Sequence, residues 1–255
     1  MSNTEQLVNT GIVGGLAEVK NVARFLTLVE TLIERPEGLP GLGVFHGYSG
    51  LGKTQASIFA QNMTDAMRIE VGESWSKKTL LQKILVEARV EPRRATIADL
   101  TELAINALAD NWPRPLFIDE ADKLADKKML ELVRELHEHS QVPVLLIGEE
   151  QLPEKLETVE RVHNRVLDWV AADYCDHDDA RLLAEVVCPE LTISDDLIDY
   201  LIETTKGRAR GLVINFNRIK EHACNYREKD LSRGSFDEDF FFTGKRRGRQ
   251  PRRAA

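Results

Sequence analysis

One run of eight residues constrains the fold of this chain more than any other feature of its sequence. The run matches the pattern G-x-x-x-x-G-K-[ST] at every fixed position and consists of Gly47, Tyr48, Ser49, Gly50, Leu51, Gly52, Lys53 and Thr54. It follows the apolar residues Val44 and Phe45, and the residues after it, up to Ala60, include no helix breaker. The sequence therefore predicts a buried strand, a glycine-rich loop and a helix in that order.

The residue types in this loop are suited to binding phosphate groups. Glycines allow backbone N–H groups to turn inward around phosphate oxygens, and a helix N-terminus favours anions. Lys53 supplies a positive charge between the β- and γ-phosphates, and the Thr54 hydroxyl can ligate Mg²⁺. We therefore predict that the eight residues of this phosphate loop contact ATP, which binds together with Mg²⁺.

A second motif supplies the acidic groups that hydrolysis of a triphosphate needs. The apolar run from Pro115 to Ile118 ends in Asp119 and Glu120, which is typical of a Walker B segment. At the carboxyl end of a parallel strand, Asp119 would hold Mg²⁺ and Glu120 would orient and polarise the water that attacks the γ-phosphate. The two motifs together predict an ATPase that produces ADP and phosphate.

The segment Asp-Glu-Ala-Asp at residues 119–122 also occurs in the RNA helicases that are named after it. Those enzymes need a second α/β domain with an arginine motif of its own. The residues beyond Asp173 show only a short helical pattern, so we reject that alternative.

Strand and helix patterns alternate before Asp173, which predicts a parallel α/β sheet. We expect strands at residues 67–71, 116–119 and 142–148, and helices at residues 16–34, 79–88, 97–111 and 129–139. Beyond residue 176 the pattern is wholly helical, with candidates at residues 178–187, 195–204 and 212–226. We expect an N-terminal arm (1–13), an α/β ATPase core (14–173), a helical lid (174–230) and a basic C-terminal tail (231–255).

Composition favours a cytoplasmic protein without a membrane partner. The longest apolar runs are strand-sized, and the polar opening lacks the charged and apolar regions of a secretory signal. The three cysteines, Cys175, Cys188 and Cys224, are odd in number and lack metal-binding spacing, so neither a disulfide framework nor a zinc site is indicated.

The charge of the chain is unevenly distributed. Its net charge is −8, yet residues 245–253 carry six positive charges and no negative one. Such a tail can bind the phosphate backbone of DNA in a salt-dependent way, through Lys245, Arg246 and Arg247 among others. A tail that only increases solubility is the alternative.

The order of these elements, from residue 12 to residue 226, resembles the AAA+ ATPases. The resemblance implies a P-loop core with a parallel sheet flanked by helices, a small all-helical lid, and a homo-oligomer. It also implies a polar sensor 1 residue after the strand that follows Walker B, where Glu149 or Glu150 stands in place of the usual Asn, Thr or Ser. Arg165 best matches the arginine that reaches a neighbouring subunit's nucleotide, with Arg161 as the second choice, and Arg210 matches the sensor 2 arginine.

Within that family, the Asp-Glu-Ala-Asp segment, the strand ending in Leu146-Ile147-Gly148 and the lid segment at residues 206–212 look like the transposition regulators. These include the B protein of phage Mu and its relatives in Tn7-like elements. The resemblance implies a filament or ring on duplex DNA that marks a target and activates a transposase.

Basic and hydroxyl residues after the second predicted strand are the candidate DNA contacts in the core, and they are Lys77, Lys78, Thr79, Arg93 and Arg94. We expect the neighbouring Trp75 to pack in the protein rather than to stack on a base. Two other functions stay open: a helicase loader of the DnaC or IstB type, and a signalling ATPase of the ExeA type that has no role on DNA.

Overall fold

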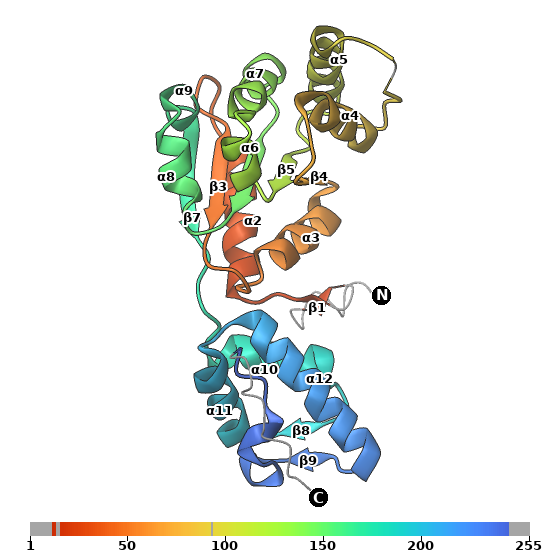
Figure 1. Ribbon diagram of the computed structural model, residues 1–255, viewed down its shortest axis with the longest axis vertical. Coiled ribbons are helices and arrows are strands. Elements are labelled where there is room, and N and C mark those ends of the chain that lie inside the picture. The colour runs from red at the N-terminus through yellow and green to blue at the C-terminus, as the bar shows by residue number, and fades with distance from the viewer. Residues whose placement is uncertain (1–11, 14–15, 93, 245–255) are drawn as a thin grey trace, which may run out of the picture. The chain divides into compact units, whose positions relative to one another are not determined.

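The computed structural model describes residues 12–13, 16–92 and 94–244. The chain divides into two compact units, Met1–Asp173 and Tyr174–Ala255. Figure 1 shows helices flanking a sheet in the first unit and a separate group of helices in the second. Four of the predicted DNA contacts, Arg93, Lys245, Arg246 and Arg247, lie outside the described residues.

The first unit is built on a five-stranded parallel sheet with the strand order β4-β5-β6-β3-β7. Its strands are β3 (Leu42–His46), β4 (Met67–Glu70), β5 (Leu116–Asp119), β6 (Val144–Gly148) and β7 (Val166–Ala171). In the register of these strands, Glu70 pairs with Asp119 and His46 pairs with Gly148. The phosphate loop, the acidic residues and the end of β6 therefore share the carboxyl edge of the sheet, where α/β proteins bind their ligands.

Helices surround this sheet, and each of them buries apolar residues in the core of the first unit. They are α2 (Lys20–Ile33), α3 (Lys53–Thr64), α4 (Lys77–Glu87), α5 (Ile97–Asp110), α6 (Asp122–Asp126), α7 (Leu130–Ser140), α8 (Leu152–Glu157) and α9 (Glu160–His163). A short antiparallel pair, β1 (Ile12–Val13) and β2 (Leu16–Ala17), precedes them. Phe25 of α2 packs edge-on against Phe45 of β3 and Phe117 of β5, with ring centroids 5.2 and 5.1 Å apart, which fixes α2 beside the two strands that lead into the site.

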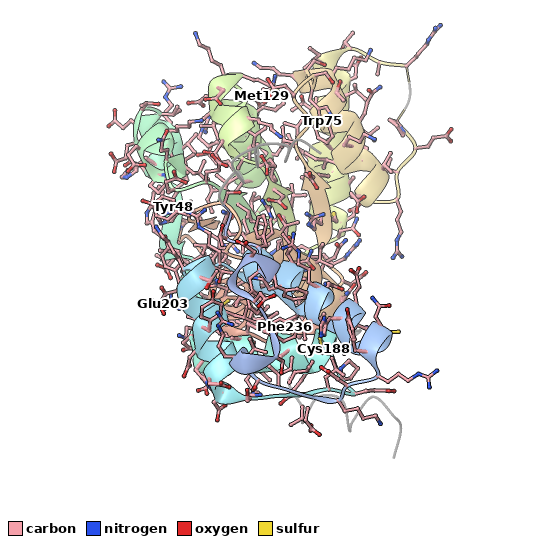
Figure 2. The ribbon with its side chains drawn as sticks, turned by 60° about the horizontal axis from the view of Figure 1, so that its bottom comes forward. Tyr48, Trp75, Met129, Cys188, Glu203 and Phe236 are labelled. Carbon is pink, nitrogen blue, oxygen red and sulfur yellow. The ribbon has the colours of Figure 1, made fainter. Side chains whose placement is uncertain are left out.

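The second unit has a hydrophobic core of its own. Its helices are α10 (His177–Val187), α11 (Asp195–Thr205) and α12 (Ala209–Tyr226), and two short parallel strands, β8 (Thr192–Ile193) and β9 (Asp230–Leu231), pair beside them. Cys188, Phe216, Phe236 and Phe241 are buried in this core, and Figure 2 labels Cys188 and Phe236 within it.

This second unit differs from the expected all-helical lid followed by a tail from residue 231. It contains the β8–β9 pair, and two short 3₁₀ helices (Arg233–Ser235 and Glu238–Phe240) continue the fold. The reason is the aromatic content of this segment, because the rings of Phe236 and Phe240 stack at 4.6 Å and the ring of Phe241 lies 5.2 Å from that of Phe240. Phe236 and Phe241 are buried and Phe240 is partly buried, which makes residues 231–241 part of the second unit rather than part of a solvated tail.

Within the described ranges, none of the helices has the length and apolar character needed to cross a lipid bilayer.

Candidate active site

The phosphate loop connects β3 to α3 through three glycines with positive φ angles. Gly47, Gly50 and Gly52 have φ values of 152°, 88° and 90°, which residues with a Cβ atom rarely adopt. A Cβ atom at position 47 would also lie only 3.1 Å from the side chain of Ala172. The path of the loop therefore requires glycine at these positions. Tyr48 of the loop is labelled in Figure 2 and is 48% exposed.

Lys53 begins α3, and its ammonium group turns back over the loop. Its Nζ atom donates hydrogen bonds to the carbonyl oxygens of Gly47, at 2.5 Å, and Tyr48, at 3.0 Å. Burial lowers the pKa of Lys53, while the nearby carboxylates oppose this effect, with Glu149 first, followed by Asp119 and two others. The ammonium group therefore lies within the electrostatic reach of both the loop and the acidic residues at the edge of the sheet.

Asp119, the last residue of β5, is buried and held from two sides. Its Oδ1 atom accepts from the backbone N–H of Glu120 at 2.9 Å, and its Oδ2 atom accepts from Nη2 of Arg68 at 2.7 Å. Arg68 was not predicted as a site residue, although a charged residue between the apolar residues Met67 and Ile69 of a predicted strand was a signal that could have identified it.

Glu120 has a different environment from its neighbour. Its φ angle of 58° lies in the left-handed region, which is uncommon for residues other than glycine and often occurs at functional sites. Its side chain is 44% exposed and forms an ion pair with Lys123 at 3.3 Å. The structure thus has a fixed, buried carboxylate next to an accessible one, which suits the separate roles of cation binding and water activation.

Asp122, the last residue of the Asp-Glu-Ala-Asp segment, links β5 to β6. Its Oδ2 atom accepts from the backbone N–H of Glu149 at 2.7 Å, and a Cβ atom on Gly148 would collide with the same carboxylate. Glycine at the end of β6 therefore makes room for this bond. The bond places Glu149 directly beyond the strand end, where the sequence predicted a sensor, with Glu150 next in the chain.

The donor set at this edge fits Mg²⁺. Within the residues that the structure describes, no group of three or more His, Cys, Asp or Glu side chains could hold a metal ion. In nucleotide sites, Mg²⁺ usually keeps several waters and binds to one or two protein oxygens together with the phosphates. Thr54, in the first turn of α3, and Asp119 offer the hard oxygen atoms that Mg²⁺ prefers.

The two candidates for the arginine that acts on a neighbouring subunit lie just before β7. Arg165 directly precedes the strand, its Nε atom donates to Oε1 of Glu138 at 2.8 Å, and its side chain is 46% exposed. Because Val166 pairs with Leu42 at the start of β3, Arg165 lies at the opposite edge of the sheet from the phosphate loop of its own chain. Arg161 is exposed on α9. The sensor 2 candidate, Arg210, is exposed in the first turn of α12 in the second unit.

The candidate DNA contacts Lys77, Lys78 and Thr79 form the first turn of α4. Ser76 caps this helix by accepting from the backbone N–H of Thr79 at 3.2 Å. The Nζ atom of Lys78 donates to the carbonyl oxygen of Ala95 at 3.1 Å, so this lysine also holds its own chain together.

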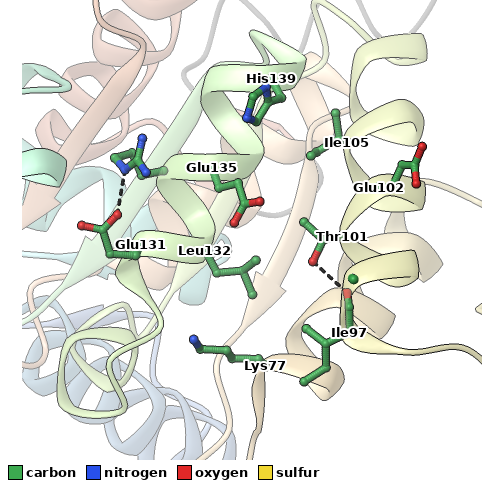
Figure 3. A pocket seen from close by; sticks show the side chains of 11 residues that line it. Lys77, Ile97, Thr101, Glu102, Ile105, Glu131, Leu132, Glu135 and His139 are labelled. Atoms are coloured by element: carbon green, nitrogen blue, oxygen red, sulfur yellow. Dashed lines mark hydrogen bonds and ion pairs between the residues drawn. The ribbon is translucent and has the colours of Figure 1, made fainter.

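Trp75, which precedes α4, packs against the core of the first unit, as expected. The candidate DNA contact Arg94 is exposed. Lys77 is exposed and lines a groove of about 740 Å³ between α5 and α7, which also carries the carboxylates of Glu131 and Glu135 (Figure 3). The groove is therefore lined by groups of both signs, since Arg134, which pairs with Glu131 at 2.8 Å, also lies in it.

Residues 37–156 match the family model described as an AAA domain. No curated protein matches the sequence. Among solved structures, the ORC2 protein of Aeropyrum pernix in its ADPNP and ADP complexes is similar with a TM-score of 0.61 and 13% identity, over 86% of this chain and 65% of that chain. The Cdc6p protein of Pyrobaculum aerophilum has a TM-score of 0.62 and 14% identity, over 83% of this chain and 63% of that chain.

The ORC1 protein of Aeropyrum pernix, solved in complex with DNA, has a TM-score of 0.62 and 16% identity, over 84% of this chain and 62% of that chain. This chain thus spans somewhat less than two thirds of the length of each of these three proteins. At such identities the similarity defines the fold. From its sheet, its phosphate loop and these similarities, we conclude that the chain has the AAA+ P-loop fold, and that its residues 37–156 are similar to AAA domains.

Proposed function

We propose that this chain binds ATP with Mg²⁺ and hydrolyses it to ADP and phosphate. The observation that carries the proposal is that the parallel sheet brings the phosphate loop with Lys53, after β3, and the carboxylates of Asp119 and Glu120, at the end of β5, to the same edge. Hydrolysis of the γ-phosphate needs a positive group beside the phosphates, which is Lys53 here, and an accessible carboxylate near them, which is Glu120.

In this proposal each group has one task. The backbone of the phosphate loop and Lys53 hold the phosphates, and Asp119 and Thr54 orient the bound cation, which neutralises charge on the phosphate oxygens. Glu120 orients the attacking water once its ion pair with Lys123 opens. Glu149 takes the sensor 1 position by acting on Lys53 rather than on the γ-phosphate, because two anions repel each other.

Three arginines are the remaining groups of this proposal. Arg165, or Arg161 in its place, reaches the nucleotide of a neighbouring subunit, since a guanidinium group stabilises the charge that develops during phosphoryl transfer. Arg210 has the sensor 2 role that its motif predicts. The exposure of all three arginines is compatible with these roles.

We further propose that the protein assembles with ATP on duplex DNA, as a filament or ring, and that this assembly delivers target DNA and activates a transposase. The resemblance of its motifs to the transposition regulators supports the role in transposition. The ORC1 protein, which shares the fold, was solved in complex with DNA, and this supports a role on DNA. The contacts to the phosphate backbone of the DNA would come from two parts of the chain. These are the core residues Lys77, Lys78, Thr79, Arg93 and Arg94 and the basic residues 245–253.

Negative-stain imaging with duplex DNA tests this function. Purified protein is compared in ATP with Mg²⁺, in a non-hydrolysable analogue and in ADP. Filaments or rings on duplex DNA in the two triphosphate conditions alone are expected. A preference for single-stranded DNA would instead favour the helicase-loader function. Assembly that does not depend on DNA would favour the signalling function.

A further inference from the structure

Arg68, the second residue of β4, connects the two motifs of the candidate active site. Its Nη2 atom donates to Oδ2 of Asp119 at 2.7 Å, and its Nε atom donates to Oγ of Ser57 at 2.9 Å. The hydroxyl of Ser57 in turn donates to the carbonyl oxygen of Thr54 at 2.8 Å. A continuous series of hydrogen bonds therefore runs between Thr54 and Asp119, the two residues expected to hold the cation.

The ion pair between Arg68 and Asp119 is buried, so water screens its two charges only weakly. The Arg68 side chain is 13% exposed and the Asp119 side chain is 4% exposed. A buried carboxylate without a partner is costly, and a planar guanidinium group is the side chain best suited to compensate it. Arg68 thus supplies at Asp119 the positive charge that a divalent cation would otherwise supply.

Two other charged groups lie near this pair. Glu70 lies 3.8 Å from the Nη2 atom of Arg68, but its side chain is 60% exposed, so solvent screens its competition with Asp119 for the guanidinium group. Lys53 is hydrogen-bonded to the loop carbonyls, where the phosphates are expected, and acts on Asp119 only through space. Arg68 is therefore the cation in direct hydrogen-bond contact with Asp119.

We propose that Arg68 neutralises Asp119 by pairing with it, and that this ion pair makes the binding of a divalent cation depend on the triphosphate. The inference rests on the ATPase function proposed above. A cation that approaches alone meets a carboxylate already paired, with a positive guanidinium group at hydrogen-bond distance. The negative charge of a triphosphate outweighs this repulsion, so cation and nucleotide enter together.

Binding of Mn²⁺ alone, followed by the electron paramagnetic resonance signal of the free ion, tests the proposal on the full-length protein. Wild-type protein is expected to retain Mn²⁺ weakly without nucleotide and strongly with ATP, after subtraction of the Mn²⁺ that the same concentration of ATP binds without protein. Arg68→Met should bind Mn²⁺ without nucleotide about tenfold more tightly or better, because the carboxylate loses its competitor. Arg68→Lys should stay close to the wild type, because it keeps the charge.

Three further variants separate this role from structural support. Asp119→Asn added to Arg68→Met should abolish the gain, and Ser57→Ala, which leaves the ion pair in place, should not produce it. Arg114→Met is the matched control, since Arg114 pairs with Asp65 at 3.2 Å elsewhere in the same unit. Where Arg68→Met does not fold, as judged by circular dichroism, Arg68→Gln removes the charge and retains an N–H donor for Asp119.

The outcomes distinguish this inference from the proposed function. If the wild type does not retain Mn²⁺ even with ATP, the ATPase function itself fails. If the wild type retains Mn²⁺ with ATP while the neutral variants bind Mn²⁺ alone no better than the wild type, the neutralising role of Arg68 is overturned.

Discussion

The side-chain amide of Asn21 both donates a hydrogen bond to the backbone of Asp173 and accepts one from it. The Nδ2 atom of Asn21 donates to the carbonyl oxygen of Asp173 at 2.8 Å, and its Oδ1 atom accepts from the backbone N–H of Asp173 at 2.8 Å. The same Nδ2 atom also donates to the carbonyl oxygen of Leu51 in the phosphate loop at 2.9 Å. A single buried side chain of α2 therefore fixes the phosphate loop to the last residue of the first unit.

Asn21→Ala should destabilise the first unit by about 2–4 kcal/mol, because it removes three side-chain hydrogen bonds to the backbone of Leu51 and Asp173. The three tryptophans, Trp75, Trp112 and Trp169, all lie in this unit, so their fluorescence during urea unfolding measures the change. Thr31→Ala is the matched control on the same helix, since the Thr31 hydroxyl makes an exposed local bond to the carbonyl oxygen of Thr27, and about 0.5 kcal/mol or less is expected. Equal effects of the two substitutions would contradict this role for Asn21.

Glu120→Gln should preserve ATP binding and reduce hydrolysis by about a hundredfold or more, because an amide cannot polarise the attacking water. Binding is measured with a fluorescent nucleotide, and hydrolysis by phosphate release. Lys53→Ala provides the comparison, since it should abolish binding itself. Hydrolysis that survives the glutamine substitution would refute the assignment of Glu120.

Arg165→Ala should leave nucleotide binding by the isolated subunit intact and remove the turnover that depends on assembly. The ion pair of Arg165 with Glu138 is half-exposed, so its loss should cost at most about 1 kcal/mol of stability. ATPase rate is measured as a function of protein concentration, with Arg161→Ala in parallel. If only the Arg161 variant loses the concentration-dependent rate, Arg161 is the residue that acts in the neighbouring subunit.

Removal of residues 245–255 should weaken binding to duplex DNA mainly at low salt, because the lost contacts are to phosphates. Affinity is measured by fluorescence anisotropy over a salt series. A neutralised tail of the same length, with its six basic residues replaced by glutamine, controls for the loss of chain. A slope of log affinity against log salt that does not change would leave the tail with a solubilising role only.

Cys188 should resist alkylation in the folded protein. Burial raises the pKa of its thiol to about 11, and the thiol donates to the carbonyl oxygen of Phe216 at 3.3 Å, so almost no thiolate forms near pH 8. Cys224 is exposed and serves as the internal control. Mass spectrometry after brief iodoacetamide treatment should show modification at Cys224, with modification at Cys188 only after unfolding. Equal labelling of both would show that the second unit opens readily.

The sequence predicted most of the secondary structure closely. The strand at residues 116–119 has the predicted bounds, and the helix predicted at residues 97–111 runs from Ile97 to Asp110. These segments have strong apolar periodicity and clear end signals, such as the capping box between Thr96 and Asp99. The sequence did not predict α6, whose five residues are too few for a helical period to be recognised, and it also missed the β8–β9 pair.

In the candidate active site, too, the sequence predicted some features and missed others. The phosphate loop and the acidic residues were identified from sequence alone because each is a contiguous segment whose spacing carries its chemistry. The bonds that join these segments connect residues far apart in the chain: Arg68 and Asp119 are 51 positions apart, Asp122 and Glu149 are 27 apart, and Asn21 and Asp173 are 152 apart. No local pattern encodes such pairs, because the strand order and register of the sheet bring them together. The sequence by itself thus determined the chemistry of the two motifs, and only the tertiary structure decided which side chains hold them in place.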